Sequence, residues 1–88
     1  MMIKNLTEKP LTLKAMQVAF GEAWVADRHP KVIMASGKTF KAMTNVLGAD
    51  RQWNGAQLVD IGTVADGEIQ FHVPEAPEQN VTLVNVAA

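Results

Sequence analysis

The sequence predicts an α+β domain in which two helices pack on a small mixed or mainly antiparallel sheet. Two stretches, residues 12–26 and 37–47, carry apolar residues at intervals of three and four, the spacing of one helical face. From residue 58 onward the apolar spacing changes to two, which is typical of strands. With short apolar runs at 2–6 and 31–35, the expected order is strand, helix, strand, helix and three strands.

The first helix is expected to begin after Thr12, whose hydroxyl can cap it. It should end before Pro30, because proline disfavours helical geometry in the residue that precedes it. The second helix follows Ser36, another capping residue, and stops at Gly48, a typical residue of helix C-termini. Between the two helices, residues 31–35 form an apolar run that indicates a buried strand.

Three strands complete the predicted sheet. Asp66-Gly67 is a hairpin signal between the apolar stretch that begins at Leu58 and the alternating residues 69–73. The predicted core combines the apolar positions of the helices and strands: Leu13, Met16, Phe20, Trp24, Ile33, Phe40, Met43, Leu47, Ile61, Ile69, Phe71 and Leu83.

The last strand, residues 81–86, is apolar on both faces. Val81 and Leu83 share one face, whereas Thr82, Val84 and Val86 share the other. The strand is therefore either covered on both sides within the domain or in contact with a neighbouring chain.

Length and composition limit the classes of function. The chain has 88 residues, enough for one domain over residues 1–88, and a hydrophobic fraction of 48%. It contains no cysteine, which excludes disulfides, thiolate metal sites and cysteine catalysis. A net charge of −1 argues against binding to nucleic acid or to an acidic membrane. The first residues lack a signal-peptide pattern and no segment is apolar enough for a membrane span, so we expect a cytoplasmic protein.

The charge is divided unevenly along the chain. Residues 1–50 hold seven basic and four acidic residues, and residues 51–88 hold one basic and five acidic residues. The two halves either neutralise each other within one fold or allow head-to-tail contact between subunits.

The run Ser36-Gly37-Lys38-Thr39 is the strongest candidate for a ligand site. A strand followed by Gly-Lys-Thr at a helix start is typical of phosphate-binding loops, but the first glycine of that motif is replaced by Val32. Two interpretations stay open: an ordinary serine-capped helix, or a helix start whose N–H groups and Lys38 amine hold a phosphate or carboxylate.

Few residues indicate catalysis or a metal. Asp27 and His29 are close in sequence, and His72 lies in a predicted strand, which leaves an acid–base or metal-dependent enzyme as a distant alternative. We expect instead that Arg28 and His29 complement the C-terminal end of the first helix. No cofactor and no metal are predicted.

Trp53 is unusual because it lies in a polar stretch between residues 49 and 56. It either folds back over the core as a lid or serves as an anchor at an interface, where tryptophan is enriched.

Residues 11–47 and 56–86 resemble part of the axial domain of tailed-phage major capsid proteins. The resemblance rests on the order of three segments: 13–24, Pro30-Lys31-Val32-Ile33-Met34-Ala35-Ser36, and Thr39-Phe40-Lys41-Ala42-Met43. The chain lacks the long backbone helix, extended loop and peripheral domain of a capsid subunit. The resemblance implies a small assembly protein with a structural role.

The sequence therefore predicts a non-enzymatic protein–protein interaction or assembly module, either a homo-oligomer or a partner of another protein, in the cytoplasm or within a virus particle. Its predicted interface residues are Trp53, Val84 and Val86. The alternative is a small-molecule or anion-binding domain that uses residues 36–39.

Overall fold

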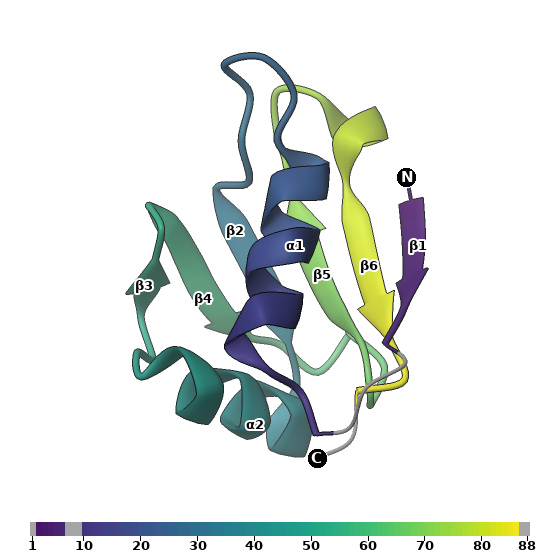
Figure 1. Cartoon of the computed structure of the whole chain (residues 1–88). Helices are drawn as coiled ribbons and strands as arrows, with labels where there is room; N and C mark the ends of the chain where they lie inside the picture. The colour runs from purple at the N-terminus through teal and green to yellow at the C-terminus, as the bar shows by residue number, and fades with distance from the viewer. Residues whose placement is uncertain (1, 7–9, 87–88) are drawn as a thin grey trace.

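The computed structural model describes residues 2–6 and 10–86 (Figure 1). The helices are α1 (Leu13–Ala23) and α2 (Gly37–Leu47), and a 3₁₀ turn covers Pro77–Gln79. In the described residues six strands form one sheet, in the order β1-β6-β5-β2-β4-β3. The strands are β1 (Met2–Asn5), β2 (Val32–Ala35), β3 (Gln52–Trp53), β4 (Ala56–Asp60), β5 (Ile69–His72) and β6 (Val81–Val84). The α+β prediction with a mixed sheet is confirmed.

The sheet is mixed because two of its five strand pairs are parallel and three are antiparallel. β1 runs parallel to β6 and β2 runs parallel to β4, whereas β2–β5, β5–β6 and β3–β4 are antiparallel. The β2–α2–β4 unit is a parallel crossover, which requires an intervening segment long enough for a helix. The connection from β1 through α1 to β2 moves across the sheet in the same direction as the connection from β2 through α2 to β4. Right-handed crossovers that move in one direction place their helices on the same face of the sheet, so α1 and α2 lie on one face.

The predicted hairpin at Asp66-Gly67 is wrong. β4 and β5 are not neighbours, because β2 lies between them and Ile33 pairs with both Leu58 and Phe71. The N–H of Gly67 donates instead to the hydroxyl of Thr39 on α2, at 2.9 Å.

A tight hairpin joins β3 to β4 at another dipeptide. Asn54 and Gly55 both have positive φ, 52° and 79°, as two-residue hairpin turns of this hand require. Trp53 and Ala56 flank the turn and pair across it. Residues 49–56, predicted to be only a polar turn region, thus include an edge strand.

The helix starts follow the sequence closely, but α1 ends three residues early. Thr12 caps α1 by accepting the N–H of Ala15 at 3.1 Å, as predicted. After Ala23 the chain turns out of the helix, with Ala26 at a φ of 57°. The side-chain amide of Gln79 donates to the Ala23 carbonyl at 3.1 Å and so satisfies the helix end. α2 spans the predicted residues and ends at Gly48, whose φ is 66°.

One hydrophobic cluster lies between the helices and one face of the sheet. Seven predicted core residues are buried in it, and Phe40 and Leu47 are half-buried against it. The prediction is wrong for Leu13, Trp24 and Ile61, which are 43%, 50% and 36% exposed. Leu11 fills the position expected for Leu13, Trp24 has left the helical stripe, and Ile61 lies in a turn beyond β4. The seven confirmed residues are Met16, Phe20, Ile33, Met43, Ile69, Phe71 and Leu83.

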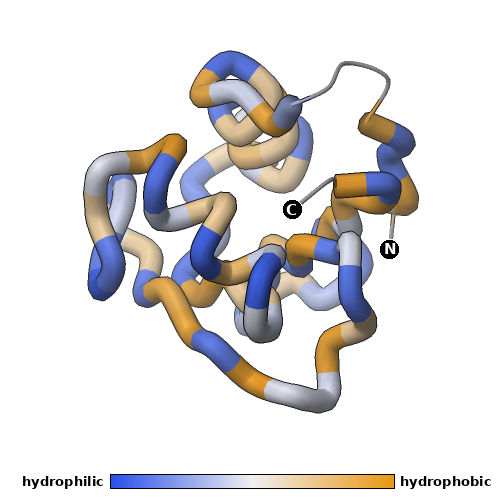
Figure 2. The backbone as a smooth tube through the Cα atoms, turned by 90° about the horizontal axis from the view of Figure 1, so that it is seen from below, coloured by the Kyte–Doolittle hydropathy of each residue, from blue (hydrophilic) through white to orange (hydrophobic). Residues whose placement is uncertain are grey.

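Hydrophobic and hydrophilic segments alternate along the described chain, without a long run of either (Figure 2). Neither α1 nor α2, the helices of the described residues, is long and apolar enough to cross a membrane.

Candidate interaction surface

The face of the sheet opposite the helices is a continuous surface to which all six strands contribute. Strand pairing fixes its members, because residues paired across a sheet point to the same side. We call this surface the open face. It comprises Ile3, Asn5, Val32, Met34, Gln52, Gln57, Val59, Gln70, His72, Thr82 and Val84.

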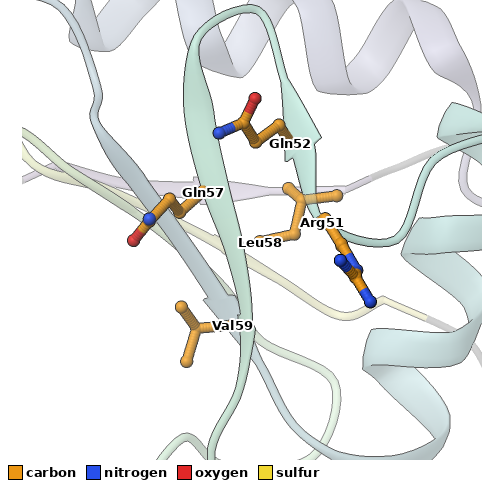
Figure 3. A pocket seen from close by; sticks show the side chains of 5 residues that line it. All are labelled: Arg51, Gln52, Gln57, Leu58 and Val59. Carbon is orange, nitrogen blue, oxygen red and sulfur yellow. The ribbon is translucent and has the colours of Figure 1, made fainter.

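The alternation that produces the open face is visible on β4. Gln57 and Val59 project to one side of the strand and Leu58 to the other (Figure 3). Leu58 is buried under the helices, whereas Gln57 is exposed and Val59 half-buried. Beside this strand lies a shallow depression of about 440 Å³, and Arg51 and Gln52 complete its lining.

The open face combines apolar side chains with uncharged polar ones. Its apolar members are Ile3, which is 66% exposed, and four half-buried residues. None of its eleven positions carries Lys, Arg, Asp or Glu, and neither helix of the described residues lies over it. Apolar side chains that gather on an exposed face often mark a site of contact with another molecule. The four half-buried apolar residues are Val32, Met34, Val59 and Val84.

A hydrogen-bond network at one edge of the open face holds His72 neutral. Asn80 accepts the Val73 N–H through Oδ1 at 2.7 Å, which turns its Nδ2 toward His72 Nδ1, at 3.4 Å. Nδ1 is thereby an acceptor, and Nε2–H donates to Gln70 Oε1 at 2.9 Å. Burial lowers the pKa of His72 below its ordinary value, which also favours the neutral ring.

Acidification is therefore expected to destabilise the protein through His72. The pKa of His72 is lowered from 6.5 in the folded state, so the unfolded chain binds the proton more readily. The stabilisation is complete above pH 6.5 and is lost as the pH falls through the lowered pKa of the folded protein. Thermal unfolding between about pH 7.5 and pH 5 measures this loss.

The matched variant is His72→Gln, which replaces the imidazole with an uncharged amide that can still hydrogen-bond and removes the titration. It should lose this part of the pH dependence, and every other ionisable group is the same in the two proteins. An unchanged pH slope in His72→Gln would contradict the assignment.

Several polar groups of the helix start at residues 36–39 are bonded within the chain. Ser36 is the N-cap residue of α2, but its buried hydroxyl donates to the Val64 carbonyl at 2.9 Å and makes no side-chain cap bond, which corrects the predicted cap. The Gly37 N–H donates to the Asp60 carboxylate at 3.1 Å, and the Thr39 hydroxyl accepts from Gly67. An anion there would have to replace a carboxylate of the same chain.

Lys38 lies beside this helix start in an open depression of about 600 Å³. Asp66 lines the same depression, so a bound anion would meet a second carboxylate close to the lysine. The residues predicted for an anion site thus lie beside two carboxylates, Asp60 and Asp66. Anion binding at residues 36–39 stays a prediction.

The two histidines belong to separate networks. His29 contacts the Pro30 carbonyl through Nδ1 at 2.9 Å and the rings of Phe20 and Trp24, whereas His72 lies on the open face. Residues 2–6 and 10–86 contain no group of three His, Asp or Glu side chains that could hold a metal. The Ala23 carbonyl at the end of α1 accepts a hydrogen bond from Gln79, and the electrostatic role expected for Arg28 and His29 at this helix end stays a prediction.

Trp53 lies on the helix side of the sheet. It is half-buried against the core, and its ring meets Phe20 edge to face with centroids 5.4 Å apart. This geometry favours the core lid over the interface anchor. Trp24, predicted to be buried, instead exposes half of its side chain at the end of α1 and donates Nε1–H to the Ala26 carbonyl.

Val84 and Val86 have different surroundings although both were expected on one face. Val84 is half-buried on the open face. Val86 is 6% exposed within the core cluster, because Asn85 has a φ of 63° and ends the alternation. The N–H of Val86 then bonds to the Gly67 carbonyl at 2.9 Å. Val86 is therefore not part of the open face.

The basic and acidic halves of the sequence are interleaved in the fold. β5 and β6, from the acidic half, lie between β1 and β2, from the basic half. Lys31 pairs with Glu75 across the two halves at 2.8 Å. This arrangement supports neutralisation within one fold over head-to-tail contact.

Comparison with protein-family models, with curated proteins and with solved structures finds no match to this chain. The function proposed below therefore rests on the surface itself.

Proposed function

We propose that this protein is a small non-enzymatic module for protein–protein contact and that it works as a homo-oligomer. The observation that carries the proposal is the open face, eleven uncharged strand positions with no helix above them in the described part of the chain. Removing apolar surface from water is favourable by about 25 cal/mol per Å². A second protein surface is a natural cover for such a face.

Other features support a role in protein–protein contact and not in catalysis or nucleic-acid binding. The candidate acid–base residues are divided between two networks, so they offer no paired nucleophile and base. The open face has no lysine or arginine for phosphate groups, which argues against a nucleic-acid partner. An assembly role in a phage-type particle, which the resemblance to capsid axial domains implies, and a site of action in the cytoplasm or in that particle belong to the same proposal.

The mass in solution tests the proposal. Light scattering coupled to size exclusion should give a mass above the 9.6 kDa of one chain, and this mass should rise with protein concentration. The reason is that the open face of each molecule needs a partner. A mass of one chain at every concentration up to the millimolar range would contradict the proposal.

A further inference from the structure

We infer that the partner of the open face is a second copy of this chain, stacked sheet against sheet across a two-fold axis near Met34 and Gln70. The inference rests on the proposed function and identifies the partner and its geometry. Four properties of the open face lead to it: its charge, its hydrogen-bonding groups, its strand register and its area.

The charge of the open face suits contact with itself. A two-fold interface brings the same patch of both copies together, so any net charge on the patch meets its own sign. The eleven positions hold no residue that is charged at neutral pH, and His72 is held neutral by its network. Like-charge repulsion among these eleven positions is therefore absent, whereas a strongly acidic or basic partner would find no complementary charge at them.

The polar groups of the open face are complementary to copies of themselves. Four of them are amides, and an amide both donates and accepts hydrogen bonds. Two copies of such a side chain can therefore bond to each other across a two-fold axis, which two lysines or two glutamates cannot. The four amides are Asn5, Gln52, Gln57 and Gln70.

The strand register locates the centre of the contact. β5 and β2 occupy the two middle positions of the strand order, and Gln70 pairs with Met34 across them. The same row continues to Val59 on one side and to Thr82 and then Ile3 on the other. A row of mostly apolar side chains thus crosses five strands, with Met34 and Gln70 at its middle.

The area fits a weak dimer. Five strands of four or five residues and the two-residue β3, about 4.8 Å apart, give a face that would bury somewhat less than about 1,000 Å² over both copies. This is near the lower limit of specific interfaces. Stacked sheets lie about 10 Å apart with strands crossing at about 30°, and the twist of each sheet produces this angle. We therefore expect a dimer that dissociates on dilution.

The experiment makes the same substitution, glutamine to glutamate, once on the open face of the sheet and once on the helix layer. Gln57→Glu places a carboxylate on the open face without a change in size, and Gln17→Glu places it on the exposed surface of α1. Sedimentation equilibrium should show a dissociation constant at least about tenfold higher for Gln57→Glu, since in the dimer each added carboxylate leaves water and meets an uncharged face. Gln17→Glu should retain the wild-type value.

Met34→Glu adds a charge at the centre of the contact and should abolish the dimer, with circular dichroism to confirm that the variant is folded. If the wild type associates but Gln57→Glu and Gln17→Glu behave alike, the inference is wrong and the proposed function stands. If the wild type is a monomer throughout the concentration range, the proposed function itself fails.

Discussion

Replacing Phe71 with alanine is expected to lower the free energy of unfolding by about 3–5 kcal/mol. Phe71 has 0% exposure in β5, in the middle of the sheet, where it pairs with Ile33 and Val81. Because neighbouring strands hold these residues in place, the cavity left by the ring cannot collapse easily. A domain of this size has only about 5–15 kcal/mol in total, so most of its stability would be lost.

Chemical denaturation measures this loss, and Phe40→Ala is its matched control. Phe40 is half-buried on α2, so removal of its ring should cost less. The two losses would rank in the opposite order if α2 and not the sheet formed the centre of the core.

Replacing Asn80 with alanine is expected to cost about 1–3 kcal/mol, although the side chain is small. Asn80 Oδ1 accepts the N–H of Val73, a residue 1% exposed, at 2.7 Å. Without this oxygen, a buried donor would lack its acceptor, and the network that orients His72 would lose one member.

Asn80→Asp separates the lost hydrogen bond from the lost volume, because it keeps an oxygen acceptor at the same place. It should be more stable than Asn80→Ala, and amide exchange at Val73 should be faster in the alanine variant alone. Equal stability and equal exchange in the two variants would show that the 2.7 Å contact contributes little.

Helix ends were predictable because the contacts that define them are local. Thr12 caps α1 through an N–H three residues away, and Gly48 ends α2 with its own backbone conformation. The C-terminal end of α1 was not predictable, because the amide that satisfies Ala23 belongs to Gln79, 56 residues further along the chain. The sequence pattern extends the helix past Ala23, and a helix of that length would put Trp24 on its buried face.

Hairpins, too, depend both on the local turn sequence and on which strands become neighbours in the folded sheet. Asn54-Gly55 and Asp66-Gly67 are similar turn signals, yet only the first closes a hairpin. The second is bound by Thr39 on α2, and β2 is inserted between the strands that flank it. Two dipeptides of this kind cannot be distinguished without the sheet order.

The candidate surface was only partly predictable. The alternation of residues 81–86 indicated an apolar second face on β6, and Val84 lies there. The other members come from five further strands, and the parallel pairing of β1 with β6 and of β2 with β4 brings them together. Val86 was assigned to this face because nothing nearby signals the positive φ of Asn85.

Intermolecular contacts of the Met34 methyl group test the sheet-to-sheet association most directly. In an equal mixture of isotope-labelled and unlabelled chains, filtered nuclear Overhauser spectra detect only contacts between different molecules. We predict contacts from the Met34 methyl to Met34, Val32 and Val59 of the other copy, since all three lie on the open face. Intermolecular contacts confined to Trp24 and Val25, the exposed residues at the end of α1, would contradict association through the sheet.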